Sequence, residues 1–170
     1  MTRVKLIWKY LDGPDLLRKN NQHKSLTLRM LSVFIINTFV IALAVILHFE
    51  MLSRLSILMP RLTIRYRFRI AVGIFGALIA HIMEVWLFAF AYFFLIKSNR
   101  FGTLEGIGDA NLLNCSYYSF VTYTTLGFGD IVPVGNLRFL TGLESLTGLV
   151  LITWTASFMF FEMQKYWNND

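Results

Sequence analysis

The chain has 170 residues, of which 56% are hydrophobic and only 15% are charged. Soluble domains average roughly 45–50% and 25%, so the length allows one domain and the composition argues against both a disordered chain and a soluble globule. A single cysteine, Cys115, excludes a disulfide framework and a cysteine-based zinc site. In so apolar a chain, the net charge of +6 indicates loops at lipid headgroups and no nucleic-acid site.

The amino-terminal segment, residues 1–30, is basic and differs from the rest of the chain. Its apolar residues recur at helical spacing between lysines and arginines; they are Val4, Ile7, Trp8 and Leu11. This pattern predicts an amphipathic helix that lies in the membrane interface. A plain solvated tail is the alternative interpretation.

The apolar part of the chain contains three stretches that are long enough to cross a bilayer. A crossing needs roughly 20 apolar residues, and residues 31–49, 70–96 and 138–161 meet this length. A basic linker, residues 50–69, joins the first two stretches, and a short tail, residues 162–170, follows the third. The sequence therefore predicts an all-α integral membrane protein with three membrane helices, in which the linker and the tail are cytoplasmic.

The segment between the second and third stretches is too polar to span a membrane and too apolar for an ordinary loop. Residues 115–124 read CSYYSFVTYT and predict a short re-entrant helix, and residues 125–130 follow as TLGFGD. The alternating glycines Gly127 and Gly129 allow backbone conformations that a side chain would forbid. Consecutive carbonyl groups can then point the same way, and four copies around one axis would form rings of oxygens that replace the water shell of a monovalent cation. Non-helical backbone at membrane depth is tolerated where it lines such a wet pore.

These features resemble the potassium-channel pore family, whose filter reads TVGYG followed by Asp, and more closely its small bacterial ion-channel members. The resemblance covers residues 70–161 as outer helix 70–96, pore helix 115–124, filter 125–130 and inner helix 138–161. It implies that K⁺ is held by backbone carbonyls and by one threonine hydroxyl, without any other cofactor. The filter residues so identified are Thr125, Leu126, Gly127, Phe128 and Gly129, with the carbonyls of the first four as the K⁺ ligands.

The resemblance also implies which residues support the filter. In the family two aromatic residues of the pore helix buttress the filter, and Tyr117 and Tyr118 occupy that position here, with Thr124 before the filter and Asp130 after it. Many relatives place a carboxylate four residues before the filter threonine, where this chain has Val121. That departure, together with Leu and Phe in the filter, favours a looser filter as the alternative.

Two carboxyl groups interrupt the apolar stretches. Glu84 shares a helix face with His81. At 1.5 Å per residue, Glu84 lies about 22 Å along its helix from Arg69, and Glu144 lies about 9 Å from Arg138. Both carboxyls then fall beside the pore helix, where a neutral carboxyl can donate a hydrogen bond to polar groups behind the filter. We expect Glu144 to be the first such support and Glu84 the second; a proton-sensing network and a purely structural hydrogen bond remain alternatives.

The third stretch contains a glycine, Gly148, near its middle. The resemblance implies a gating hinge there, and close helix packing is the alternative. Candidates for the lining of an inner cavity are Thr153, Thr155 and Ser157. His23, His48 and His81 are far apart and show no ligand spacing, so the sequence predicts no metal cluster. It also shows no nucleophile–base pair and no nucleotide loop, which excludes the common enzyme classes.

The function expected from the resemblance is passive conduction of K⁺ by a homotetramer, because each chain supplies one filter segment. The chain would be a multi-pass protein of the bacterial inner membrane. The alternatives are a weakly selective monovalent cation channel and a non-conducting membrane interaction subunit. A filter that faces outward puts the basic linker in the cytoplasm, as the positive-inside rule requires. Three spans then put seven basic amino-terminal residues outside, unless the first stretch does not fully span.

Overall fold

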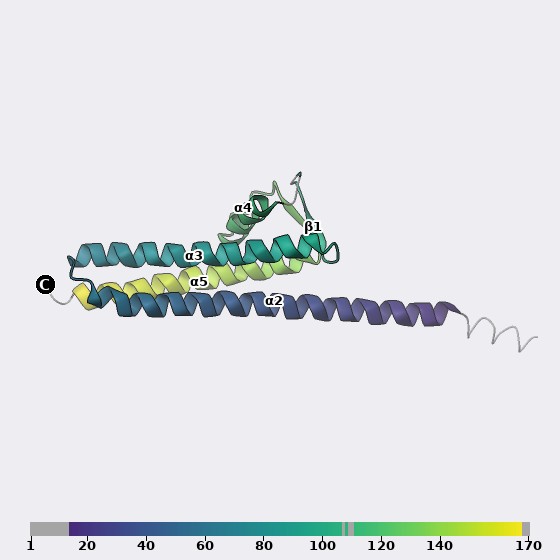
Figure 1. Cartoon of the computed structure of the whole chain (residues 1–170), viewed down its shortest axis with the longest axis horizontal. Coiled ribbons are helices and arrows are strands. Elements are labelled where there is room, and N and C mark those ends of the chain that lie inside the picture. Colours follow the sequence, from purple (N-terminus) through teal and green to yellow (C-terminus); the bar gives the residue numbers. More distant parts are fainter. Residues whose placement is uncertain (1–13, 107, 109–110, 168–170) are drawn as a thin grey trace, which may run out of the picture. The chain divides into compact units, whose positions relative to one another are not determined.

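The computed structural model describes the whole chain except residues 1–13, 107, 109–110 and 168–170. The amphipathic helix expected around residues 4–11 lies outside the described part. The chain divides into two compact units, residues 1–36 and residues 37–170. The first contains the beginning of the long helix α2, and the second contains every other element (Figure 1).

Helix α2, Pro14–Arg61, is longer at both ends than the stretch 31–49 that was expected to span. Past residue 49 it continues because apolar residues still recur on one face: Leu52, Leu55 and Met59 are buried and form a core cluster. Of the range 50–69 that was expected as a linker, residues 50–61 continue α2 and residues 66–69 begin α3. Only residues 62–65 separate α2 from α3.

Helices α3, Tyr66–Lys97, and α5, Leu137–Trp167, extend a few residues beyond the ranges 70–96 and 138–161. With 32 residues, α3 is about 48 Å long, well above the roughly 30 Å of a bilayer core. Three helices are long and apolar enough to cross a membrane: Met30–Arg61, Arg67–Lys97 and Leu137–Lys165. The expected all-α membrane architecture with three candidate spans is confirmed.

A shorter helix and two strands connect α3 to α5. Helix α4, Leu112–Tyr123, begins three residues earlier than expected because Asn111 caps it: the Asn111 side chain accepts a hydrogen bond from the Asn114 N–H at 2.8 Å. Strands β1, Gly102–Glu105, and β2, Val132–Gly135, pair antiparallel with Gly102 opposite Gly135. The sequence pattern did not predict these strands. They join the two ends of the segment that holds α4, which packs against both α3 and α5 (Figure 1).

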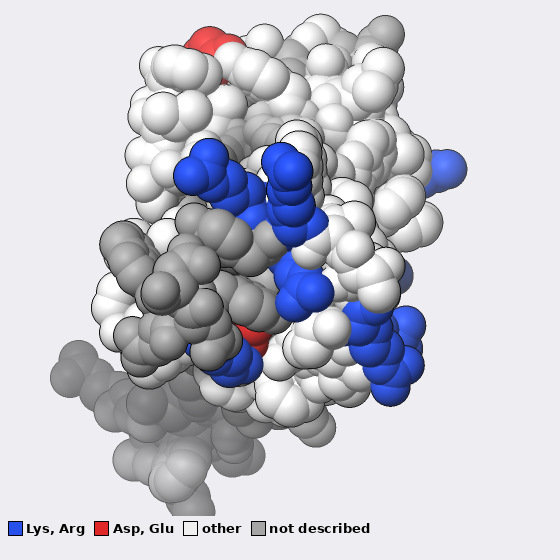
Figure 2. All heavy atoms as spheres, turned by 90° about the vertical axis from the view of Figure 1, so that its left-hand side faces the viewer, with Lys and Arg blue, Asp and Glu red and all other residues white. Residues whose placement is uncertain are grey.

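Basic side chains gather at the end of the second unit where α2 ends, α3 begins and α5 ends. Figure 2 shows this end face with its lysines and arginines in blue. Exposed members of this basic end are Arg54, Arg61, Arg65, Arg67 and Lys165. A cluster of cations beside three apolar helix ends is typical of a headgroup contact.

Candidate functional site

Residues 125–130, called the filter segment below, follow directly after the carboxyl end of α4. The Leu126 N–H donates to the Val121 carbonyl at 2.9 Å, and the Thr125 N–H donates to the Thr122 carbonyl at 3.0 Å. This pair of bonds is a Schellman motif, which ends a helix by a left-handed residue. That residue is Thr125, with φ of 60°. A β-branched side chain is strained there, so the two hydrogen bonds hold the first filter residue in a costly conformation.

The handedness of the backbone alternates along the filter segment. Thr125, Gly127 and Gly129 have positive φ, with values of 60°, 55° and 79°, whereas Leu126 and Phe128 do not. A Cβ on either glycine would meet no atom within 4 Å, so the backbone angle and not the available space demands glycine there. A backbone in which positive φ recurs at every second residue can turn successive peptide groups the same way. Carbonyl oxygens on one side of such a segment can coordinate a cation.

Asp130, at the carboxyl end of the filter segment, is held by hydrogen bonds to both carboxylate oxygens. The Tyr117 O–H donates to Oδ2 at 2.8 Å, and the Ile131 N–H donates to Oδ1 at 3.1 Å. The hydrogen bond to Asp130, with some desolvation and the Asp130 charge, raises the pKa of Tyr117. The phenol therefore stays protonated and remains a donor at neutral pH. Tyr117 thus provides a polar contact to Asp130 that Val121 cannot provide.

The other residues expected to support the filter have different contacts. The Tyr118 hydroxyl lies 2.8 Å from Thr141 Oγ1 and ties α4 to α5. The Thr124 hydroxyl donates to the Phe120 carbonyl of its own helix at 2.6 Å. A hollow of about 360 Å³ separates α4, the filter segment and α5, and its lining includes Val121 and Ser145.

Glu144 lies fully buried on α5, between α3 and α4. The Tyr92 O–H donates to Oε2 at 2.6 Å, and Ser119 Oγ lies 2.5 Å from Oε1. Ser119 Oγ also lies 2.9 Å from the Val85 carbonyl, which can only accept. The Ser119 hydroxyl therefore has two acceptors within reach, the Val85 carbonyl and Glu144 Oε1. Glu144 therefore joins three helices one turn before the end of α4 and does not touch the filter segment.

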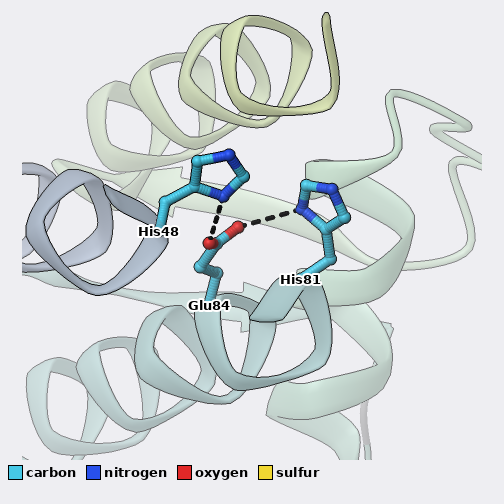
Figure 3. Close-up of side chains that lie close together, drawn as sticks. All are labelled: His48, His81 and Glu84. Carbon is cyan, nitrogen blue, oxygen red and sulfur yellow. Dashed lines mark hydrogen bonds and ion pairs between the residues drawn. The ribbon is translucent and has the colours of Figure 1, made fainter. Parts of the chain in front are cut away.

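Glu84, on α3, contacts the last residue of α4 instead. The Tyr123 O–H donates to Glu84 Oε2. His81 Nδ1 lies 3.1 Å from the same oxygen, and His48 Nδ1 lies 2.7 Å from Oε1 (Figure 3). The expected order of the two carboxyls is thus reversed, because Glu84 and not Glu144 reaches the base of the filter segment.

The same cluster corrects the expectation about histidines. His48 and His81 meet at Glu84, although His48 is 36 residues from Glu84 in the sequence. Thr155, which was expected to line an inner cavity, contacts both histidines. Its hydroxyl lies 3.0 Å from His81 Nε2 and 3.4 Å from His48 Nε2. A signal was present in the sequence, since His48 is the first titratable residue after the uncharged run of residues 31–47.

Gly148 occupies a close contact between α5 and the end of α4. A Cβ at this position would lie 2.2 Å from the Tyr123 carbonyl oxygen. Helix α5 is unbroken through this point. The structure therefore gives Gly148 a packing role, and its role as a hinge stays a prediction.

We compared the chain with models of known protein families. A family model described as "Ion channel" matches residues 69–165, which is more than half of the chain. The chain belongs to this ion-channel family. Searches of curated proteins and of solved structures found no match to the chain.

The matched region of this ion channel contains α4, the filter segment and almost all of α3 and α5. Together with its three apolar helices, the family makes the chain a membrane protein that interacts with ions and has no enzymatic role. Helix α2 lies outside the matched region. It is therefore an addition to the family's domain, and His48 is the residue through which it reaches Glu84.

Proposed function

We propose that this ion channel conducts K⁺ passively through a homotetrameric pore lined by four filter segments. The observation that carries the proposal is the alternating handedness of Thr125 to Gly129 directly after a capped pore helix. In this proposal the carbonyls of Thr125, Leu126, Gly127 and Phe128, with the Thr125 hydroxyl, replace the hydration shell of the ion. The carboxyl end of α4 adds a favourable field, because its free carbonyls carry partial negative charge.

Exposure of the filter segment in a single chain supports an assembly. Residues 124–130 are all exposed, and the side chains of Leu126 and Phe128 are 62% and 66% accessible. Apolar side chains beside a non-helical backbone need cover from protein within a membrane. One chain supplies one carbonyl column, and four columns close the rings that K⁺ needs.

The basic end of the second unit supports an orientation. We propose that Arg61, Arg65 and Arg67 face the cytoplasm of a bacterial cell, as the positive-inside rule favours. Helix α3 then runs outward, the filter segment opens to the outside, and α5 returns to the cytoplasmic face. A tag at each terminus, tested for access from either side of intact cells, checks this orientation.

The proposal is tested with purified protein in liposomes. Native mass measurement should give four chains, and reversal potentials in mixed K⁺ and Na⁺ should follow the K⁺ gradient, with block by Ba²⁺. Gly127→Ala should abolish flux, because a left-handed alanine costs roughly 1–2 kcal/mol in each chain. Gly142→Ala is the matched control, since a Cβ there meets nothing within 4 Å. A stable monomer or dimer as the only species, or a conducting Gly127→Ala variant, would contradict the proposal.

A weakly selective monovalent cation channel is the second candidate. The apolar Val121 and the hollow that it lines leave the filter segment with less support from its own pore helix. Reversal potentials that do not distinguish K⁺ from Na⁺ would favour this candidate. Tetramers without any flux would favour a non-conducting subunit.

A further inference from the structure

We propose that His48, His81 and Glu84 form a binding site for a divalent transition-metal ion, for which Zn²⁺ is the reference. The site lies between α2 and α3, next to the last residue of α4 and apart from the filter segment (Figure 3). Two imidazoles and a carboxylate suit zinc and its neighbours, whereas K⁺ prefers oxygen ligands alone.

The distances fit such an ion. One ligand atom from each of the three residues lies within 4.8 Å of the others. Zinc bonds to nitrogen and oxygen measure about 2.0–2.2 Å, so two ligand atoms of one tetrahedral ion are about 3.4 Å apart. The longest separation must therefore close by up to about 1.4 Å, which side-chain rotation about the χ angles has to supply. The Tyr123 hydroxyl, 3.0 Å from His81 Nδ1, or a water molecule can supply a fourth ligand.

The opposite nitrogens of both rings support the same assignment. Both histidines direct Nδ1 to Glu84, and both direct Nε2 to the hydroxyl of Thr155. A hydroxyl has two lone pairs, so Thr155 can accept an N–H from each ring. In that tautomer both Nδ1 lone pairs are directed at the metal ion beside the carboxylate, whereas without an ion each Nδ1–H donates to Glu84 instead. Metal-binding histidines commonly donate their second N–H to such an orienting group.

Burial and charge also favour a cation at this point. The side chains of His48 and Glu84 are fully buried, whereas that of His81 is 16% accessible. A dication balances the carboxylate and leaves one positive charge beside the carboxyl end of α4, where helix carbonyls attract it. The ion would fasten α2, which the family model does not include, to the ion-channel domain behind Tyr123.

The test uses the full-length assembly without a polyhistidine tag, stripped with a chelator and titrated with Zn²⁺ at pH 8. We expect one ion per chain by elemental analysis, and visible absorption of the four-coordinate type when Co²⁺ replaces Zn²⁺. His81→Gln and Glu84→Gln should weaken binding at least tenfold. His23→Gln is the matched control, because it removes the chain's remaining histidine outside the cluster, and it should bind as the parent does.

A further variant keeps the test valid if the ligand variants fail to fold. Thr155→Val keeps all three ligands and removes the shared N–H acceptor, so Zn²⁺ affinity should fall about 10–100-fold while the assembly persists. Absence of Zn²⁺ binding in the parent, or equal affinity in the parent, His81→Gln and Thr155→Val, would overturn the proposal. A parent that binds no Zn²⁺ but melts differently at pH 5 and pH 8 only when His81 is present would assign the cluster to a proton instead. None of these readouts depends on ion conduction, so they fail independently of the proposed function.

Discussion

Replacement of Gly148 by alanine tests the contact that places the pore helix against α5. The new Cβ would lie 2.2 Å from the Tyr123 carbonyl oxygen, whereas carbon and oxygen in ordinary contact are about 3.3 Å apart. The obstacle is backbone, so α4 or α5 must move by about 1.1 Å. Overpacking of this kind costs about 1–3 kcal/mol, and each chain of an assembly would bear that cost. We therefore expect Gly148→Ala to lower the melting temperature and, because Tyr123 precedes the filter segment, to reduce flux.

Gly142→Ala is the control for this substitution on the same helix. A Cβ at Gly142 meets nothing within 4 Å, and alanine is favoured over glycine inside a helix by up to about 1 kcal/mol. Gly142→Ala should thus melt at or above the parent temperature. If Gly148 acts only as a hinge, its alanine variant should lose flux and gain stability. A Gly148→Ala variant that melts like Gly142→Ala would refute the packing argument.

Substitutions at three further residues test the other contacts. Glu144→Gln keeps an acceptor for the Tyr92 hydroxyl and a polar partner for Ser119, and it should melt like the parent. Glu144→Ala leaves those groups unsatisfied at roughly 1–3 kcal/mol each and should melt lower; equal melting of the two variants would contradict this support. Tyr117→Phe removes the donor to Asp130 and should speed the decay of flux under sustained conduction while melting changes little; an unchanged decay would contradict this support. Asn111→Ala removes the cap of α4 and should cost about 1 kcal/mol of helix stability. Hydrogen exchange in α4 should then be faster in the variant than in the parent, while exchange in α5 stays the same.

Hydropathy predicted the three long helices because a membrane span requires only length and apolar character. It assigned residues 50–69 to a linker because of their arginines, and α2 continues to Arg61 within that range because Leu52, Leu55 and Met59 form a buried helix face. The strands β1 and β2 were missed because four residues are too few for a periodic pattern. Their pairing depends on glycines: a Cβ on Gly102 would lie 1.9 Å from the Val134 carbonyl oxygen.

Side-chain contacts between helices were harder to predict than the helices. A helix that is apolar all round gives no periodicity from which its rotation can be read. The rotation of α5 decides whether Thr155 faces a cavity or the two histidines, and the rotation of α3 brings Glu84 rather than Glu144 to Tyr123. The motif TLGFGD was readable because its glycines reflect local backbone geometry, which does not depend on how the helices are rotated.

The two ends of the filter segment are held by different parts of the molecule. The carboxyl end depends on a contact within the connecting segment itself, between Tyr117 and Asp130. The base depends on other helices, because Tyr123 contacts Glu84 of α3 through its hydroxyl and Gly148 of α5 through its carbonyl. Since Glu84 also binds His48, a change in the packing of α2 reaches the base through two hydrogen bonds but reaches the carboxyl end through none of those described here. Substitutions that change the packing of α2 should therefore alter the contacts of Tyr123 at the base of the filter segment. They should leave unaltered the decay of flux that Tyr117→Phe is expected to speed.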